Sequence, residues 1–224
     1  MSRSMTMNIS LIFVLFAANI SFAQVNQLSA EQQDRMIIVR IDNETFTCYR
    51  YGEGQKYPYF FPVVGPSSGI SVTTESSLPY PHHRSLWFAC DRVNRGNYWQ
   101  EGNERGQIIS AGAQIIENTP EVIIIEDNCV WKEPEEDPII SDHRSIKITA
   151  PSNDKRIIDF KIKLTALTEI TVLKTNHSLF SARMHPQLSV ANGGNLIHAE
   201  GLSGEKSTAG VESAWIDYFG SRFG

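Results

Sequence analysis

The sequence predicts an all-β fold, an antiparallel β-sandwich, on the strength of two patterns. Apolar residues recur at every second position, most clearly in residues 158–166 (Ile-Asp-Phe-Lys-Ile-Lys-Leu-Thr-Ala). Clusters of turn-forming residues separate such runs, as at Pro134–Pro138 and Asn192–Gly194. No long, capped helical periodicity is present. Because each alternating run buries one face, the runs are expected to pack as sheets against one another.

The first 23 residues have the three parts of a secretion signal. Arg3 gives a positive start, Leu11–Ala18 is the apolar core, and Ser21-Phe22-Ala23 has a small-x-small cleavage pattern. The core is too short to cross a bilayer as a helix, and no later segment approaches a membrane span. We therefore expect cleavage near Ala23–Gln24 and a periplasmic or secreted protein with no membrane span after signal removal. The alternative is an uncleaved anchor.

The mature chain is expected to be one domain, residues 24–224, because it contains neither an internal repeat nor a long linker. Its polar start, residues 25–35, is expected to form one short helix. Runs rich in β-branched residues predict strands at residues 36–41, 45–51, 107–117, 121–131, 145–149 and 158–166. Residues 58–85 are instead rich in Pro, Tyr, Gly and Ser. They are expected to form long ordered loops, in which sites are often built.

Charge and cysteine content limit the partners and the redox state. Removing the signal deletes one charged residue, Arg3, which moves the net charge from −5 to −6. That mild acidity, without a basic stripe, argues against a nucleic-acid partner. The three cysteines, Cys48, Cys90 and Cys129, cannot all pair within one chain. One disulfide with a free thiol, or three reduced thiols, are both compatible with their spacing.

The strongest site candidate is Pro81–Ala89, which places His82, His83 and Arg84 beside Trp87. On an extended backbone His82 and Arg84 would share one face and His83 the other, a poor geometry for a two-histidine metal clamp. We therefore assign no metal ligand, although a metal stays open if a distant residue joins one histidine. The structural alternative is a histidine bonded to its own loop and an internal ion pair at Arg84.

Amide and aromatic residues follow at once, with Asn94, Tyr98 and Trp99 close together. Planar hydrogen-bonding groups and ring faces are what a sugar-binding cleft needs. Trp87, inside an apolar run, is more typical of the core.

Two later clusters carry similar chemistry. If residues 177–184 form a strand, His177, Ser181 and Arg183 lie on one face, with Leu179 also on that face, and Asn176 precedes them. A solvated outer face would give the same pattern. Farther on, Glu200 and Glu205 are flanked by glycines, and a carboxylate near an imidazole would form an acid–base pair. For Glu205 a solvated turn is an equal alternative.

Several enzyme classes are excluded by missing motifs. The sequence has no Gly-x-Ser-x-Gly, no phosphate-cradling Gly-rich loop before a helix and no dinucleotide fingerprint. Serine hydrolase, kinase and Rossmann functions are therefore not expected.

Taken together, these clusters resemble the PmoA-like family, bacterial proteins of unknown function commonly labelled methane oxygenase PmoA. The resemblance runs from about Phe60 to the end of the chain, and His-His-Arg-Ser-Leu-Trp-Phe is its most specific part. The other segments that carry it are Val93-Asn94, Tyr98-Trp99, Thr175–Phe180, Glu200-Gly201, Gly204–Lys206 and Trp215–Tyr218. The oxygenase name is not taken as a function, because the true oxygenase subunit is an integral membrane protein.

The resemblance implies a galactose-mutarotase-like supersandwich and work on carbohydrates. This chain departs from the family at two places. Cys90-Asp91-Arg92 stands where members usually have His-Gly-Asp, and the chain stops at Gly224 where members continue through further strands. A C-terminally truncated sandwich is therefore expected.

The leading hypothesis is an exported carbohydrate-active enzyme that uses His/Glu acid–base chemistry on a sugar or glycoside, with no cofactor named. In it, histidines transfer protons or act as ligands, Arg84 and Arg183 bind hydroxylate or carboxylate groups, and Glu200 is acid or base. The catalytic candidates are His82, His83, Arg84, His177 and Glu200, and the substrate-binding candidates are Asn94, Trp99, Asn176, Arg183 and Glu205. The expected partner is a small-molecule or oligosaccharide ligand. The alternatives are a non-catalytic carbohydrate-binding module and a His-ligated metal-dependent enzyme.

Overall fold

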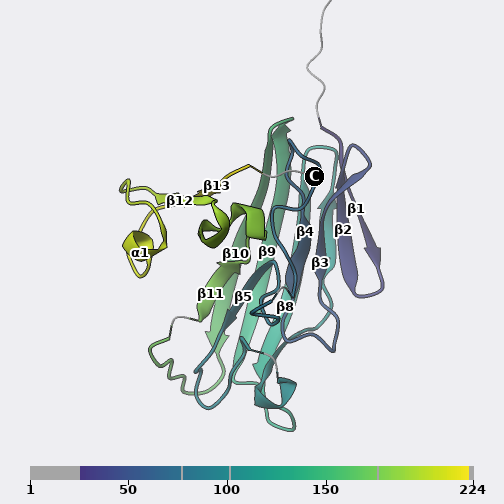
Figure 1. The fold of residues 1–224 in the computed structure, drawn as a ribbon. Coiled ribbons are helices and arrows are strands. Elements are labelled where there is room, and N and C mark those ends of the chain that lie inside the picture. The colour runs from purple at the N-terminus through teal and green to yellow at the C-terminus, as the bar shows by residue number, and fades with distance from the viewer. Residues whose placement is uncertain (1–25, 77, 101, 176, 222–224) are drawn as a thin grey trace, which may run out of the picture.

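The computed structural model describes residues 26–76, 78–100, 102–175 and 177–221, so the predicted secretion signal and Asn176 lie outside the described residues. Nearly all its regular structure is antiparallel β-sheet, and two large sheets pack together as the predicted sandwich (Figure 1). The first sheet has the order β1 (Leu28–Gln33), β2 (Met36–Ile41), β3 (Glu44–Arg50), β4 (Tyr59–Val63), β5 (Leu86–Cys90) and β11 (Ser178–Ala182).

The second sheet runs β10 (Lys155–Ala166), β9 (Ile140–Ser152) and β8 (Ile123–Lys132), and both β6 (Gln107–Ser110) and β7 (Gln114–Asn118) pair with β8. A smaller lobe follows β11 (Figure 1). It holds the hairpin of β12 (Asn195–His198) and β13 (Ile216–Phe219), with short helical turns η2 (Pro186–Leu188), η3 (Val190–Asn192) and α1 (Glu205–Thr208). A further turn, η1 (Asn103–Arg105), precedes β6.

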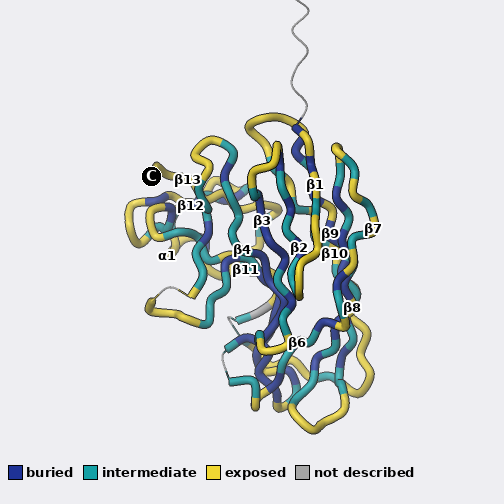
Figure 2. The backbone as a smooth tube through the Cα atoms, turned by 90° about the vertical axis from the view of Figure 1, so that its right-hand side faces the viewer, coloured by how far each residue is buried: buried dark blue, intermediate teal, exposed yellow. Residues whose placement is uncertain are grey.

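The alternating sequence pattern sets which side of each strand is buried. In β9, Ile146 and Ile148 are buried while the alternate residues Ser145 and Lys147 are not, and β8 alternates in the same way. Figure 2 shows the buried residues along the strands and the exposed ones at the turns. One continuous core cluster joins both sheets, with Ile37 and Val39 from β2 and Ile123 and Ile125 from β8 among its members.

Three expectations about elements were wrong. Residues 28–33 form a strand and not a helix, because Asp34 (φ 52°) turns the chain back and β1 pairs with β2 along its whole length. Residues 107–117 form two strands, because Gly112 (φ 123°) breaks the run between β6 and β7. Residues 58–85 begin with β4, which pairs with both β3 and β5, and the described residues between β4 and β5 form loops as expected. In each case strand pairing or a turn overrides the local composition.

A buried polar cluster crosses the space between the sheets, and we call it the core network. Tyr49 donates to Asp127 (2.8 Å), Trp131 donates to Asp142 (2.7 Å), and Arg144 bonds both oxygens of Asp142 (2.8 and 3.0 Å). Burial raises the pKa of Tyr49 well above its usual value, which keeps its hydroxyl a donor. The network's members are Tyr49, Ser110, Asp127, Trp131, Asp142 and Arg144.

Candidate functional site

The His82-His83 segment is a turn and not an extended strand. A hydrogen bond from His83 N–H to the Tyr80 carbonyl (3.0 Å) closes it. The two imidazole rings therefore meet edge to face, with centroids 4.6 Å apart. The expectation that they point to opposite sides was wrong, because the turn removes the alternation that an extended backbone would impose.

The Arg84 side chain forms an ion pair with a neighbouring carboxylate. Its Nη1 lies 3.6 Å from the Glu75 carboxylate and 2.5 Å from Ser76 Oγ, which it bonds as donor. The same carboxylate pairs with Arg50 (3.6 Å). Arg84 thus makes the internal ion pair that sequence analysis gave as the alternative, and it anchors the turn that carries the histidines.

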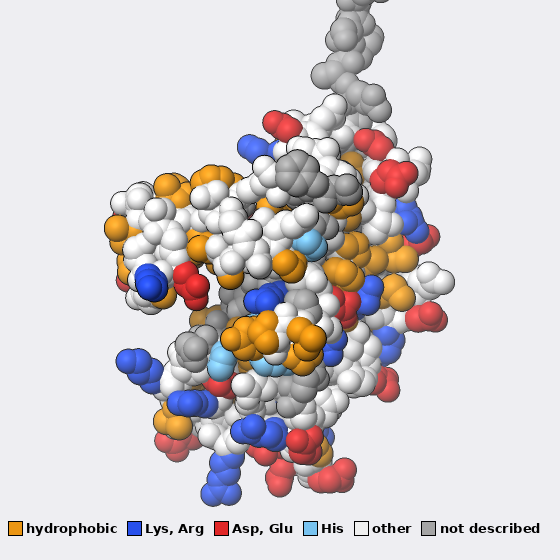
Figure 3. Space-filling view, viewed as in Figure 1, with side chains coloured by type: hydrophobic (Ala, Val, Ile, Leu, Met, Phe, Trp, Pro, Cys, Tyr) orange, Lys and Arg blue, Asp and Glu red, His pale blue; other side chains and the backbone are white. Residues whose placement is uncertain are grey.

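The outer side of the first sheet carries an open cavity of about 640 Å³, which we call the histidine cavity. It brings together five of the predicted site residues: His82, His83, Trp99, His177 and Arg183. Figure 3 shows histidine side chains beside a hydrophobic group on the side of the molecule where β5 and β11 lie. The other lining residues are Tyr80, Trp87, Gln100, Phe180, Ser181, Ala182 and Tyr218.

Two tryptophans support the histidines from behind. The Trp87 and Trp99 rings lie 5.1 Å apart, and only 3% and 5% of these residues is exposed. His83 packs on Trp87 at 5.5 Å, and His177 packs on Trp99 at 5.7 Å. Trp87 is core, as the sequence predicted, and Trp99 is buried beside it. The large exposed rings at the cavity are Tyr80, Phe180 and Tyr218.

The sequence reasoning missed one residue, Asp91. Its Oδ2 lies 3.1 Å from His177 Nδ1, and its side chain is 7% exposed against 32% for His177. Strand pairing produces the contact, since Ser178 pairs with Cys90 and Asp91 N–H donates to the His177 carbonyl (3.0 Å). The signal available in the sequence was an aspartate directly after the apolar run Leu86–Cys90.

The Asp91–His177 pair is arranged for proton transfer. A buried carboxylate that accepts from Nδ1–H holds the imidazole in one tautomer and leaves Nε2 as the basic nitrogen. Because His177 lines the cavity, that imidazole borders a space large enough for a sugar ring. The pair therefore has the geometry of a base and its orienting group.

His83 is held neutral at ordinary pH. The pKa of His83 is lowered from 6.5 to about 4, first by burial and then, in decreasing order of effect, by the nearby His82, Arg183 and His177. A neutral imidazole both donates and accepts a hydrogen bond. His83 is therefore suited to bind a hydroxyl group in the cavity.

Three of the remaining predicted residues lie elsewhere. Asn94 ties a loop together, because it accepts from Thr171 N–H (2.8 Å) and donates to the Glu169 carbonyl (3.1 Å). Glu200 sits in the smaller lobe, 2.8 Å from His198 Nδ1, and a hydrogen bond from Ser213 lowers its pKa. Glu205 lines a neighbouring depression of about 670 Å³.

Leu179 breaks the expected division of its strand. Its φ of 64° lies in the left-handed region, which is strained for a residue with a branched side chain. Leu179 lines an apolar depression with Cys90, Val93 and Trp131, whereas Phe180 and Ser181 line the histidine cavity. The expectation that Leu179 shares a face with His177 and Ser181 was wrong, because this residue interrupts the alternation.

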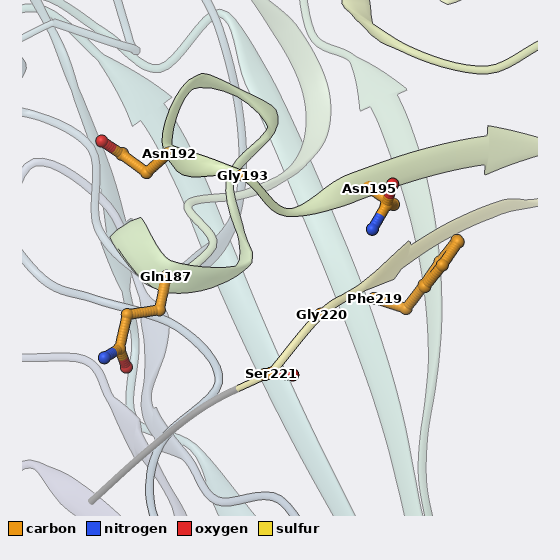
Figure 4. Close-up of a pocket in the computed structure, with 7 residues that line it drawn as sticks. All are labelled: Gln187, Asn192, Gly193, Asn195, Phe219, Gly220 and Ser221. Carbon is orange, nitrogen blue, oxygen red and sulfur yellow. The ribbon is translucent and has the colours of Figure 1, made fainter.

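Another depression, of about 620 Å³, lies between η2, η3 and the β12–β13 hairpin (Figure 4). None of the residues that line it has a titratable side chain. They are Gln187, Asn192, Gly193, Asn195, Phe219, Gly220 and Ser221. We place no chemistry there.

The three cysteines are free and buried, so of the two alternatives left open the structure has three reduced thiols and not one disulfide with a free thiol. Burial raises the pKa of the Cys48, Cys90 and Cys129 thiols, so they act as inert core groups. Among the described residues, no group of three or more His, Cys, Asp or Glu side chains is placed to hold a metal ion. In the same ranges, no helix is both long and apolar enough to cross a membrane.

Comparison with known proteins gives one match. Neither the curated proteins nor the solved structures contain a match to this chain. A family model matches residues 37–223, and its description is "Family of unknown function (DUF6807)"; nothing in that match links the chain to PmoA. The match covers both sheets from β2 onward and every described residue of the histidine cavity. The chain therefore belongs to the family of unknown function DUF6807.

Proposed function

We propose that this protein is a carbohydrate-active enzyme whose histidine cavity performs proton transfer on a sugar or glycoside. One observation carries the proposal: a buried carboxylate orients His177 beside a cavity with exposed aromatic rings and neutral hydrogen-bonding groups. Residues paired in this way recur where an enzyme moves a proton. The cavity volume, about 640 Å³, accommodates one or two sugar rings.

The cavity residues have separable roles in this proposal. His177 Nε2 accepts a proton from the substrate, and Asp91 stabilises the imidazolium that results. His83, neutral at pH 7, bonds a substrate hydroxyl, and His82 lies against it. The exposed ring of Tyr218 offers a face for the C–H side of a sugar.

The non-catalytic alternative, a carbohydrate-binding module, needs exposed aromatic platforms. Trp87 and Trp99 are too buried for that use, which leaves Tyr80, Phe180 and Tyr218. A binding module has no need of a buried aspartate behind a histidine. The Asp91–His177 pair is thus the feature that favours an enzyme over a binding module.

The decisive experiment incubates the full chain with a panel of mono- and oligosaccharides and follows the sugars by NMR. We expect new sugar signals with the wild type and none with His177→Gln. The matched control is His143→Gln, because His143 lies on β9 of the other sheet and bonds Asn128. Line broadening without conversion in the wild type would overturn the enzyme proposal in favour of a binding module.

We also infer that the protein acts in the periplasm or outside the cell. The support is the leader pattern of residues 1–23, which lie outside the described residues. N-terminal sequencing of the protein purified from an exporting host tests this, with cleavage near Ala23–Gln24 as the expected result. An intact N-terminus in the cytoplasmic fraction would contradict it.

A further inference from the structure

The charge of the histidine cavity is one-sided. Among the described residues, its lining includes Arg183 and three imidazoles but no carboxylate. Asp91 lies behind the wall, where it is almost fully buried and bonded to His177. The described lining therefore presents positive and neutral groups to a ligand.

Arg183 is held in place without an acidic partner. Its backbone N–H donates to the Ser85 carbonyl (2.6 Å), and its own carbonyl accepts from Thr74 N–H (3.0 Å). The guanidinium stands over the Tyr80 ring at 5.6 Å. In the part of the chain that the structure describes, no carboxylate lies within salt-bridge distance of it, and its buried Nε has no acceptor.

Such a guanidinium is better suited to a ligand anion than to a structural role. Arg84, which directly precedes the Ser85 that bonds the Arg183 backbone, shows the contrast because it is paired with Glu75. A planar guanidinium fork matches a carboxylate through two parallel N–H···O bonds. A single fixed positive charge also matches a ligand that carries one negative charge.

We infer that the substrate is an acidic sugar, a uronic acid residue whose carboxylate binds Arg183. This inference rests on the proposed function, since it names the substrate class of the same cavity. In this arrangement the ring hydroxyls meet His82 and His83, and the carbon next to the carboxylate lies toward the cavity wall that holds His177.

The cavity also has room for a longer chain. Tyr80, Ala182, Arg183 and Tyr218 line both the histidine cavity and the neighbouring depression, so the two adjoin at Arg183. Glu205 lines only the second depression. Negative charge on the ligand is therefore favoured at Arg183 and disfavoured beyond it, which suits a uronic acid linked to a neutral sugar.

A matched ligand pair tests the inference on the wild-type full chain. Methyl galacturonide and methyl galactoside differ only at C6, where one has a carboxylate and the other a hydroxymethyl group. We expect at least tenfold tighter binding of the uronide by calorimetry at low salt. Equal affinity for the two, or preference for galactose 6-sulfate over the uronide, would overturn the assignment of a carboxylate.

Variants locate the effect at one residue. Arg183→Gln is expected to abolish the preference for the uronide, and Arg183→Lys to retain part of it. Arg40→Gln is the control, because Arg40 lies on β2 in a surface pair with Glu31. A preference unchanged in Arg183→Gln contradicts the inference. The wild-type comparison keeps the test valid if a variant fails to fold.

The outcomes separate this inference from the proposed function. His177-dependent conversion of neutral sugars and uronides at equal rates would support the enzyme proposal and overturn the assignment of a uronic acid as the substrate. Arg183-dependent uronide binding without conversion of any sugar would support the ligand class and overturn the enzyme proposal.

Discussion

The core network between the sheets and the histidine cavity outside them use similar residue types but differ in how completely those residues are hydrogen-bonded. In the core network both oxygens of Asp127 and of Asp142 have partners, and Arg144 bonds Asp142 twice. At the cavity, several buried polar atoms have no partner in the described part of the chain: Trp87 Nε1, Trp99 Nε1, Asp91 Oδ1 and Arg183 Nε.

The difference separates a structural cluster from a candidate site. A buried polar group without a partner costs free energy, so a cluster that serves only the fold is expected to be saturated. The core network meets that expectation and is closed to solvent. The wall of the cavity keeps buried donors and an acceptor unsatisfied, a cost that is more typical of a functional site than of a purely structural cluster.

The largest effect is expected from breaking the core network. Arg144→Met leaves the Asp142 carboxylate buried without its cation, which should lower the free energy of unfolding by about 3–5 kcal/mol. Denaturant titration measures this. The control Arg40→Met removes an exposed pair with Glu31 and should cost about 1 kcal/mol or less. Similar losses for the two variants would show that the network is not a structural centre.

Next in size is the loss of the proposed base. His177→Gln should reduce turnover of the substrate found by NMR at least about a hundredfold, because the proton-transfer group is gone. The free energy of unfolding should change little, since His177 is partly exposed at the cavity. Full activity in this variant would mean that the unsaturated cluster is not the reaction site.

A smaller effect is expected at Asp91, which acts through His177. Asp91→Asn keeps the size of the side chain but removes its charge, so kcat should fall about tenfold or more while KM stays nearly constant. Steady-state kinetics separates the two constants. A rise in KM alone would indicate that Asp91 shapes the binding surface and does not position the base.

The smallest effect concerns pH. The pKa of His83 is lowered to about 4 from 6.5, so the unfolded chain takes up the proton first as pH falls. The stabilising contribution of neutral His83 is complete above pH 6.5 and is lost between pH 6.5 and 4. Because the ring is partly exposed, the loss should be about 1 kcal/mol. Denaturant titration of wild type and His83→Gln across this range checks it, and parallel curves would contradict the assignment.

Much of the sandwich could be predicted from local pattern. Alternation in residues 145–149 reflects burial of one strand face, and that information is carried by the residues themselves. In β10 the same alternation gives a half-buried face at Ile158, Phe160 and Ile162, whereas Leu164 is exposed. The polar edge strand β1 could not be predicted in this way, because its strand state comes from pairing with β2. The turn at His82-His83 was missed for a related reason, since its closure depends on a single hydrogen bond to Tyr80.

For the candidate site, the sequence predicted residue types better than roles. Adjacent histidines and a nearby arginine signal chemistry wherever they occur, and five of the ten predicted residues line the histidine cavity. The sequence could not show that Arg84 pairs with Glu75 or that Asn94 holds a loop together, because those partners come from other segments. It also could not find Asp91 as the partner of His177, 86 residues away.

By itself the sequence determined that this chain builds β-sheets with one buried face each, because side-chain alternation needs no distant partner. Only the tertiary structure decided which polar residues are saturated inside the sandwich and which surround an open cavity. The pairing of β5 with β11 brings Asp91 to His177, and the turn before β5 brings His83 beside Trp87. Such contacts depend on long-range strand register, which the residues of either strand alone do not specify.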